Sequence, residues 1–120
     1  MKKLDIKKTC KILDNIMKYE LAGVVRYTHS AMMVSGPYRI PIVEFLQAQA
    51  NESLLHAQEA GELLSGLEGH PSQKIAEIEE THKHSIKDIL QESLDHELHA
   101  LSLYNELLKE VENKSVFLEE

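Results

Sequence analysis

Two glutamates have the residue type and the spacing of buried metal ligands. Glu20 lies four residues from both Ile16 and Val24, so it shares the apolar face of a predicted helix. Glu97 lies within the apolar pattern of a later helical segment in the same way. Burying a bare carboxylate is costly, and an inward glutamate is normally paired, protonated or bound to a metal. No Lys or Arg shares these faces, so the two glutamates are candidate metal ligands.

A glutamate–histidine pair adds two further candidates. Glu52 and His56 are four residues apart, which places them on one face of a helix beside Gln49. Carboxylates with an imidazole form an oxygen and nitrogen donor set that suits iron, manganese or zinc. The alternatives stay open: Glu52 and His56 as a solvated pair on a helix surface, and Glu20 and Glu97 as boundary residues that reach solvent.

A weak internal repeat links the two glutamates. Glu20 is followed by Leu and, seven residues on, by Tyr27, and Glu97 is followed in the same way by Leu and Tyr104. Tyr27 and Tyr104 could equally be core aromatics with a hydrogen-bonded hydroxyl. The offsets from Glu20 to the glutamate–histidine pair, applied to Glu97, give positions 129 and 133, which lie beyond the 120 residues of the sequence.

The elements that position these residues are predicted to be long helices. Apolar residues recur at three, four or seven positions over about 9–34, 41–66 and 85–113, and a fourth helix is expected to begin at 115. Ser85 and Asp88 form a capping pair. The long connection between the second and third helices predicts a crossover that leaves them parallel. The expected apolar faces of these two helices are Ile42, Phe45, Leu46, Gln49, Ser53, His56, Ala60, Leu63 and Leu67, and Ile86, Ile89, Leu90, Ser93, Glu97, Leu101, Tyr104, Leu108 and Val111.

Composition narrows the class of protein. The 120 residues fit one domain, and five Gly and three Pro favour helices over a turn-rich β fold. The 13 basic and 20 acidic residues give a net charge of −7, which argues against nucleic acid or an anionic membrane as a partner. One cysteine excludes an internal disulfide, and no apolar run is long enough to span a membrane. We therefore expect a cytoplasmic protein.

The combined motifs resemble those of the ferritin-like di-iron carboxylate family, and within it the bacterioferritin branch. The stretches LDNIMKYELAGVVRY, NESLLHAQEAGELLSGLEGHP and HELHALSLY are similar to its first three helices, and the resemblance covers roughly 9–120. It implies an all-α, antiparallel four-helix bundle with a long crossover, whose fourth helix is only begun here. Whether Glu120 is the true C-terminus stays open.

The resemblance also implies roles for individual residues. Glu20 and Glu97 would be terminal ligands of two iron ions, Glu52 the bridging carboxylate and His56 the imidazole ligand. Tyr27 would orient a carboxylate behind the metal. The family's usual spacing is Glu-x-x-His, whereas here it is Glu-x-x-x-His, and the family spacing would put Ser53 at the ligand position.

The function implied is oxidation of Fe(II) by dioxygen or peroxide, with storage of iron in a shell of identical subunits. Ferroxidase activity would depend on a fourth helix being supplied. No methionine follows residue 33, which argues against haem. The alternative is a non-catalytic helical scaffold or assembly subunit without a complete metal site. A rubrerythrin-like peroxidase or a haemerythrin-like oxygen carrier fits less well, because one cysteine and few inward histidines are available.

Overall fold

The protein forms three long α-helices in the computed structural model, which describes residues 4–112. They are α1 (Ile6–Met33), α2 (Arg39–Gly66) and α3 (Ile86–Val111). The fourth helix that the sequence predicts from position 115 lies outside the described residues. None of the described helices is long and apolar enough to cross a membrane.

Side chains cap the first and third helices at their N-termini. The Asp5 carboxylate accepts a hydrogen bond from the backbone N–H of Lys8 at 3.1 Å. The Ser85 hydroxyl accepts one from the backbone N–H of Asp88 at 3.1 Å, which confirms the predicted capping pair. These bonds satisfy donors that have no partner within the first turn of a helix.

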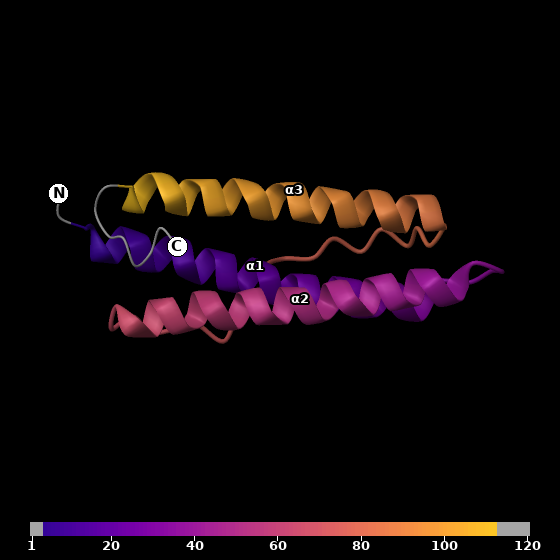
Figure 1. Ribbon diagram of the computed structural model, residues 1–120, viewed down its shortest axis with the longest axis horizontal. Helices are drawn as coiled ribbons and strands as arrows, with labels where there is room; N and C mark the ends of the chain where they lie inside the picture. Colours follow the sequence, from indigo (N-terminus) through magenta and orange to yellow (C-terminus); the bar gives the residue numbers. More distant parts are fainter. Residues whose placement is uncertain (1–3, 113–120) are drawn as a thin grey trace.

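The chain connects the helices through one tight turn and one long crossover. α1 and α2 are antiparallel neighbours, and residues 67–85 then return along α1, so α3 runs parallel to α2 (Figure 1). Two hydrogen bonds tie the crossover to α1. The backbone N–H of Ser72 donates to the Asp14 carboxylate and that of Ala76 to the Lys18 carbonyl, both at 3.0 Å. The predicted parallel arrangement is therefore present.

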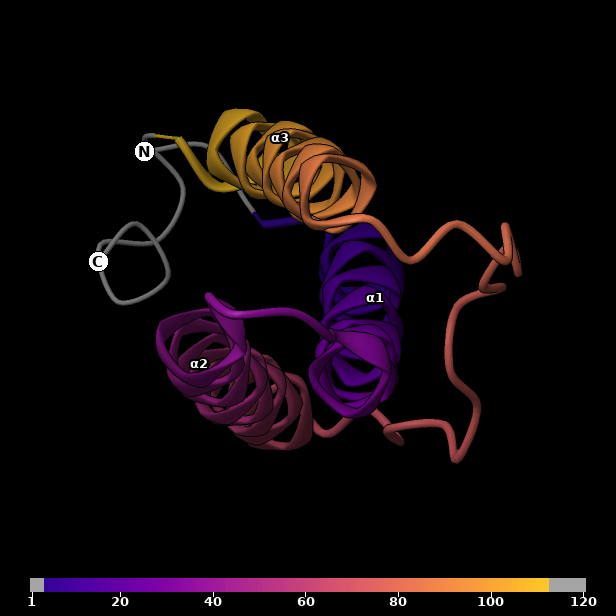
Figure 2. The same cartoon turned by 90° about the vertical axis from the view of Figure 1, so that its right-hand side faces the viewer.

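α1 lies between the other two helices. It packs against both α2 and α3, and the end-on view shows α2 and α3 on different sides of it (Figure 2). One apolar cluster gathers Leu13 and Ile16 with Leu64 and Val111, and the second gathers Tyr27, Leu46 and Ile89.

A layer of buried polar residues separates the two apolar clusters. It contains Glu20 of α1, Ser53 of α2, and Ser93 and His96 of α3. On each helix these residues lie between the segments that supply the two clusters. The fold thus places several polar side chains at mid-height of the bundle, where burial is most costly without partners.

The predicted buried faces of α2 and α3 are partly wrong. Phe45, Leu101 and Leu108 are exposed, at 44%, 56% and 48% of their surface. The residues buried instead are Ala50, Ala57 and Leu64 of α2 and His96, Ala100 and Leu107 of α3. The physical reason is that each of these helices packs chiefly on α1 within the described part of the chain, so its buried face is turned toward that helix alone.

Candidate metal centre

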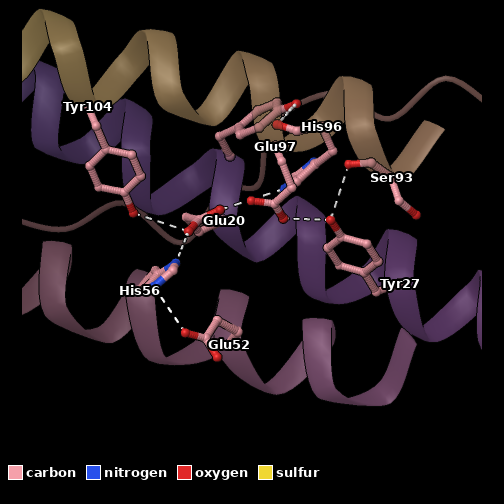
Figure 3. Close-up of polar contacts among 9 residues, drawn as sticks. Glu20, Tyr27, Glu52, His56, Ser93, His96, Glu97 and Tyr104 are labelled. Carbon is pink, nitrogen blue, oxygen red and sulfur yellow. Dashed lines mark hydrogen bonds and ion pairs between the residues drawn. The ribbon is translucent and has the colours of Figure 1, made fainter. Parts of the chain in front are cut away.

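Glu20 is the centre of the buried polar layer (Figure 3). The residue is 2% exposed, and its carboxylate contacts side chains from both other helices. Its Oε2 atom lies 2.7 Å from Nδ1 of His56 on α2 and accepts a hydrogen bond from the Tyr104 hydroxyl on α3 at 3.1 Å. Its Oε1 atom lies 3.6 Å from Nε2 of His96. The prediction that Glu20 points inward is confirmed.

These contacts keep the Glu20 carboxylate ionised. Burial alone raises the pKa of a carboxyl group, because it disfavours the charged form. The nearby imidazoles of His96 and His56 and the hydroxyl of Tyr104 outweigh burial and hold the pKa of Glu20 below its ordinary value. The interior therefore contains a negative carboxylate at neutral pH, which is the form that binds a metal cation.

The repeated glutamate–tyrosine pattern forms a reciprocal pair of hydrogen bonds between α1 and α3. Tyr104 of α3 donates to Glu20 of α1, and Tyr27 of α1 donates to Glu97 of α3 at 2.6 Å. Because the two helices are antiparallel, equal spacing on each brings both pairs together. Burial raises the pKa of Tyr27 and of Tyr104, and the neighbouring carboxylates raise both further, so each hydroxyl remains a donor.

Glu97 is less enclosed than the sequence predicts. The residue is exposed in the described structure, and its carboxylate accepts a hydrogen bond from the Tyr27 hydroxyl. Tyr27 itself is 1% exposed and fixes the direction of the Glu97 carboxylate from the core side (Figure 3). The expectation that Glu97 is buried is thus wrong for the described residues, whereas the expected carboxylate-orienting contact of Tyr27 is present.

Glu52 does not point into the bundle. Its side chain is 61% exposed, and its Oε1 atom lies 3.7 Å from Nε2 of His56. The predicted inward orientation of Glu52 is wrong, because the buried face of α2 contains Ser53 and Ala57 instead. His56 is partly buried, with a side chain 35% exposed, and its ring joins Glu20 on the inside to Glu52 on the outside.

His96 is the buried polar residue that the sequence analysis missed. The residue is 1% exposed, and neither ring nitrogen has a hydrogen-bond partner within the described structure. Its ring stacks on Tyr19 with centroids 4.3 Å apart and meets the edge of Tyr27 at 5.4 Å. A helical signal was available, because His96 lies three residues after Ser93 and four before Ala100, both of which are buried.

The candidate ligands come only partly together within residues 4–112. No group of three or more His, Cys, Asp or Glu side chains among residues 4–112 is arranged so as to hold a metal ion. Glu20 and His56 are in direct contact, and Glu97 is held separately by Tyr27. The donor types suit iron, while further ligands would have to come from outside this part of the chain.

Comparison with known proteins identifies the family. A family model described as a ferritin-like domain matches residues 10–117. The chain belongs to the ferritin-like domain family. A search of curated protein sequences gave no match. Among solved structures, this ferritin-like chain is similar to a crystal structure of ferritin-like, diiron-carboxylate proteins from Bacillus anthracis str. Ames. The TM-score is 0.84 and the identity 21%, and the match covers 91% of this chain and 77% of that one. At this identity the similarity shows the fold alone.

Proposed function

We propose that this ferritin-like protein binds Fe(II) and oxidises it with dioxygen or peroxide. The observation that carries the proposal is the buried Glu20 carboxylate in contact with Nδ1 of His56 at 2.7 Å. A carboxylate and an imidazole from two facing helices are the donors that ferritin-like proteins direct at iron. The solved relative described as a diiron-carboxylate protein supports the choice of metal.

A hollow beside the pair gives Fe(II) a route to it. This open space of about 290 Å³ is lined by His56, Glu59 and Tyr104, together with apolar side chains of all three helices. The exposed Glu52 and Glu59 lie on α2, the helix that carries His56, and the chain has a net charge of −7. This acidic balance raises the local concentration of cations.

The residues of the site have different roles in the proposed reaction. Glu20 and His56 bind Fe(II), and His56 must present an unprotonated Nδ1 to do so. Tyr104 holds the Glu20 carboxylate in position, and Tyr27 does the same for Glu97, the second carboxylate that the family resemblance offers. Each Fe(II) gives one electron, so two Fe(II) and two protons reduce one peroxide to two waters or one dioxygen to peroxide. Carboxylates remain good ligands for the Fe(III) that forms, because both oxidation states favour oxygen donors.

Aerobic addition of Fe(II), followed by absorbance in the near ultraviolet, tests this function. We expect Glu20→Ala to lose most of the oxidation rate. The matched control is Glu62→Ala, an exposed glutamate on α2, which should keep the rate of the parent. Equal rates for the parent and Glu20→Ala would show that the assignment is wrong.

A helical scaffold without metal chemistry is the second candidate. Two observations favour it: Ser53 stands where the family spacing expects a carboxylate, and the described residues hold no three-ligand group. Metal content after anaerobic loading with Fe(II) separates the two candidates. A scaffold retains no iron after gel filtration, whereas the proposed enzyme does.

Iron storage is the further part of the proposal, and it requires many copies of the chain around a common cavity. We propose a homo-oligomeric shell because family members of this fold store iron in that way. Light scattering after size-exclusion chromatography measures the mass of the assembly. A monomer or dimer at micromolar concentration would exclude storage inside a shell but would leave iron oxidation possible.

A further inference from the structure

The second helix departs from the family at the position that matters most for a metal pair. Counting back three residues from His56, the family spacing reaches Ser53, and Ser53 is 2% exposed. A serine hydroxyl cannot bridge two metal ions as a carboxylate does. The neighbouring Glu52 does not replace it, because its side chain is 61% exposed.

The imidazole of His96 fills the space beside Ser53. A Cβ atom placed on Gly23 would come within 2.6 Å of Nε2 of His96 and 2.9 Å of Oγ of Ser53, so both atoms lie directly over the α1 backbone. Tyr19 stacks on the His96 ring and Tyr27 meets it edge-on, which leaves the ring little freedom to move. The glycine, the serine and the histidine therefore fit together as a set.

A metal pair also needs its two positive charges to be bridged. Two-metal sites hold their ions about 3.5–4 Å apart, and shared carboxylates offset the repulsion between them. Here Glu20 faces His56 on one side and His96 on the other, and we call the place between Glu20 and His56 the first metal position. Among the described residues, the second position of a metal pair would have only Glu97 as a candidate ligand. The first position has a buried carboxylate and an imidazole, and the second lacks the bridging group of α2.

We propose that the site binds one metal ion per chain, at Glu20 and His56, in place of the pair that the family implies. His96 occupies the interior on the side of Ser53, so that within residues 4–112 a second ion has neither space on that side nor a bridging carboxylate from α2. This inference rests on the proposed function and makes it more specific, because it fixes the number of ions that react together.

Binding of Mn(II), used as a paramagnetic probe under anaerobic conditions, tests the number of ions. Equilibrium dialysis of the parent protein should give one Mn(II) per chain, and its electron paramagnetic resonance spectrum should show the six lines of an isolated ion. Two ions per chain with an exchange-coupled spectrum would overturn the inference and leave the proposed function standing. Binding of no ion would overturn both.

A paired variant tests the cause. Ser53→Glu combined with His96→Ala supplies the missing carboxylate and vacates the space, and it should raise the binding from one ion to two with a coupled spectrum. Glu62→Gln, which changes an exposed carboxylate on the same helix, should still bind one ion. If the paired variant has the helical circular dichroism of the parent and binds one ion, Ser53 and His96 do not set the number. If it fails to fold, the measurement on the parent decides.

Discussion

Replacing Gly23 by alanine tests whether His96 is packed as the structure shows. A Cβ atom at position 23 would lie 2.6 Å from Nε2 and 2.9 Å from Cε1 of His96, well inside ordinary van der Waals contact. The ring has no side-chain exposure and stacks on Tyr19, so it cannot retreat into solvent. In a helix without this contact, alanine in place of glycine gains about 1 kcal/mol.

Overpacking of a close-packed interior costs about 1–3 kcal/mol, which equals or exceeds that gain. We therefore expect the free energy of unfolding of Gly23→Ala to be lower than that of the parent by up to about 2 kcal/mol. Gly66 is the control, because a Cβ atom there has nothing within 4 Å. Gly66→Ala should be neutral or up to about 1 kcal/mol more stable.

Urea denaturation followed by circular dichroism measures both changes in the free energy of unfolding. A second substitution makes the test specific: in the background of His96→Ala the clash is gone, so Gly23→Ala should cost less there than in the parent. Residues in contact show such coupling energies of about 0.5–3 kcal/mol. If Gly23→Ala is as stable as Gly66→Ala, the His96 ring does not lie over Gly23 and the interior is not filled in this way.

Three further predictions concern the hydrogen bonds of the polar layer. The folded-state pKa of Glu20 is lowered, so its contribution to stability is present above the ordinary carboxyl pKa and is lost as pH falls through the folded pKa. Glu20→Gln should therefore flatten the acid side of a plot of stability against pH. An unchanged plot would contradict the ionised state of Glu20. Burial raises the pKa values of Tyr19, Tyr27 and Tyr104, so these phenols should ionise above pH 10.0 in an ultraviolet titration. Their contribution to stability should be lost as pH rises through the folded-state pKa values. Ionisation of all tyrosines together at the ordinary pKa would refute the burial of these three. Tyr104→Phe should cost about 1.5–3 kcal/mol in urea denaturation, because it removes a bond to a buried charge. Tyr27→Phe should cost less, since Glu97 can turn to water, and the reverse order would argue against the greater burial of Glu20 than of Glu97.

The sequence predicts the helices and the crossover because apolar periodicity, caps and connection length are local properties. The inward position of Glu20 follows from the same periodicity. The family resemblance implies the carboxylate-orienting contact of Tyr27, whereas the contact of Tyr104 with Glu20 was not predicted. The orientation of Glu52 could not be obtained in this way. Glu52 lies four residues before His56, and this spacing allows its carboxylate to face either the interior or the solvent. Which of the two occurs depends on which residues of α2 face α1.

The burial of His96 could not be predicted from the sequence either. The face of α3 that is buried depends on which helices pack against it, and a shift of one residue exchanges Glu97 for His96 as the inward side chain. Histidine occurs both in interiors and at surfaces, so its residue type does not settle which of the two faces inward. The structure buries His96, because Gly23 and Ser53 are small enough to leave room for the ring.

The central claim is that Glu20 and His56 bind iron in the interior of the bundle. Anaerobic equilibrium dialysis with Fe(II) measures this directly, without dependence on the later oxidation step. We expect the parent and the control Glu62→Gln to bind Fe(II). Glu20→Gln and His56→Ala, each with helical content like that of the parent, should not bind Fe(II). Equal binding of Fe(II) by all four proteins, or no binding by the parent, would show that Glu20 and His56 do not bind iron.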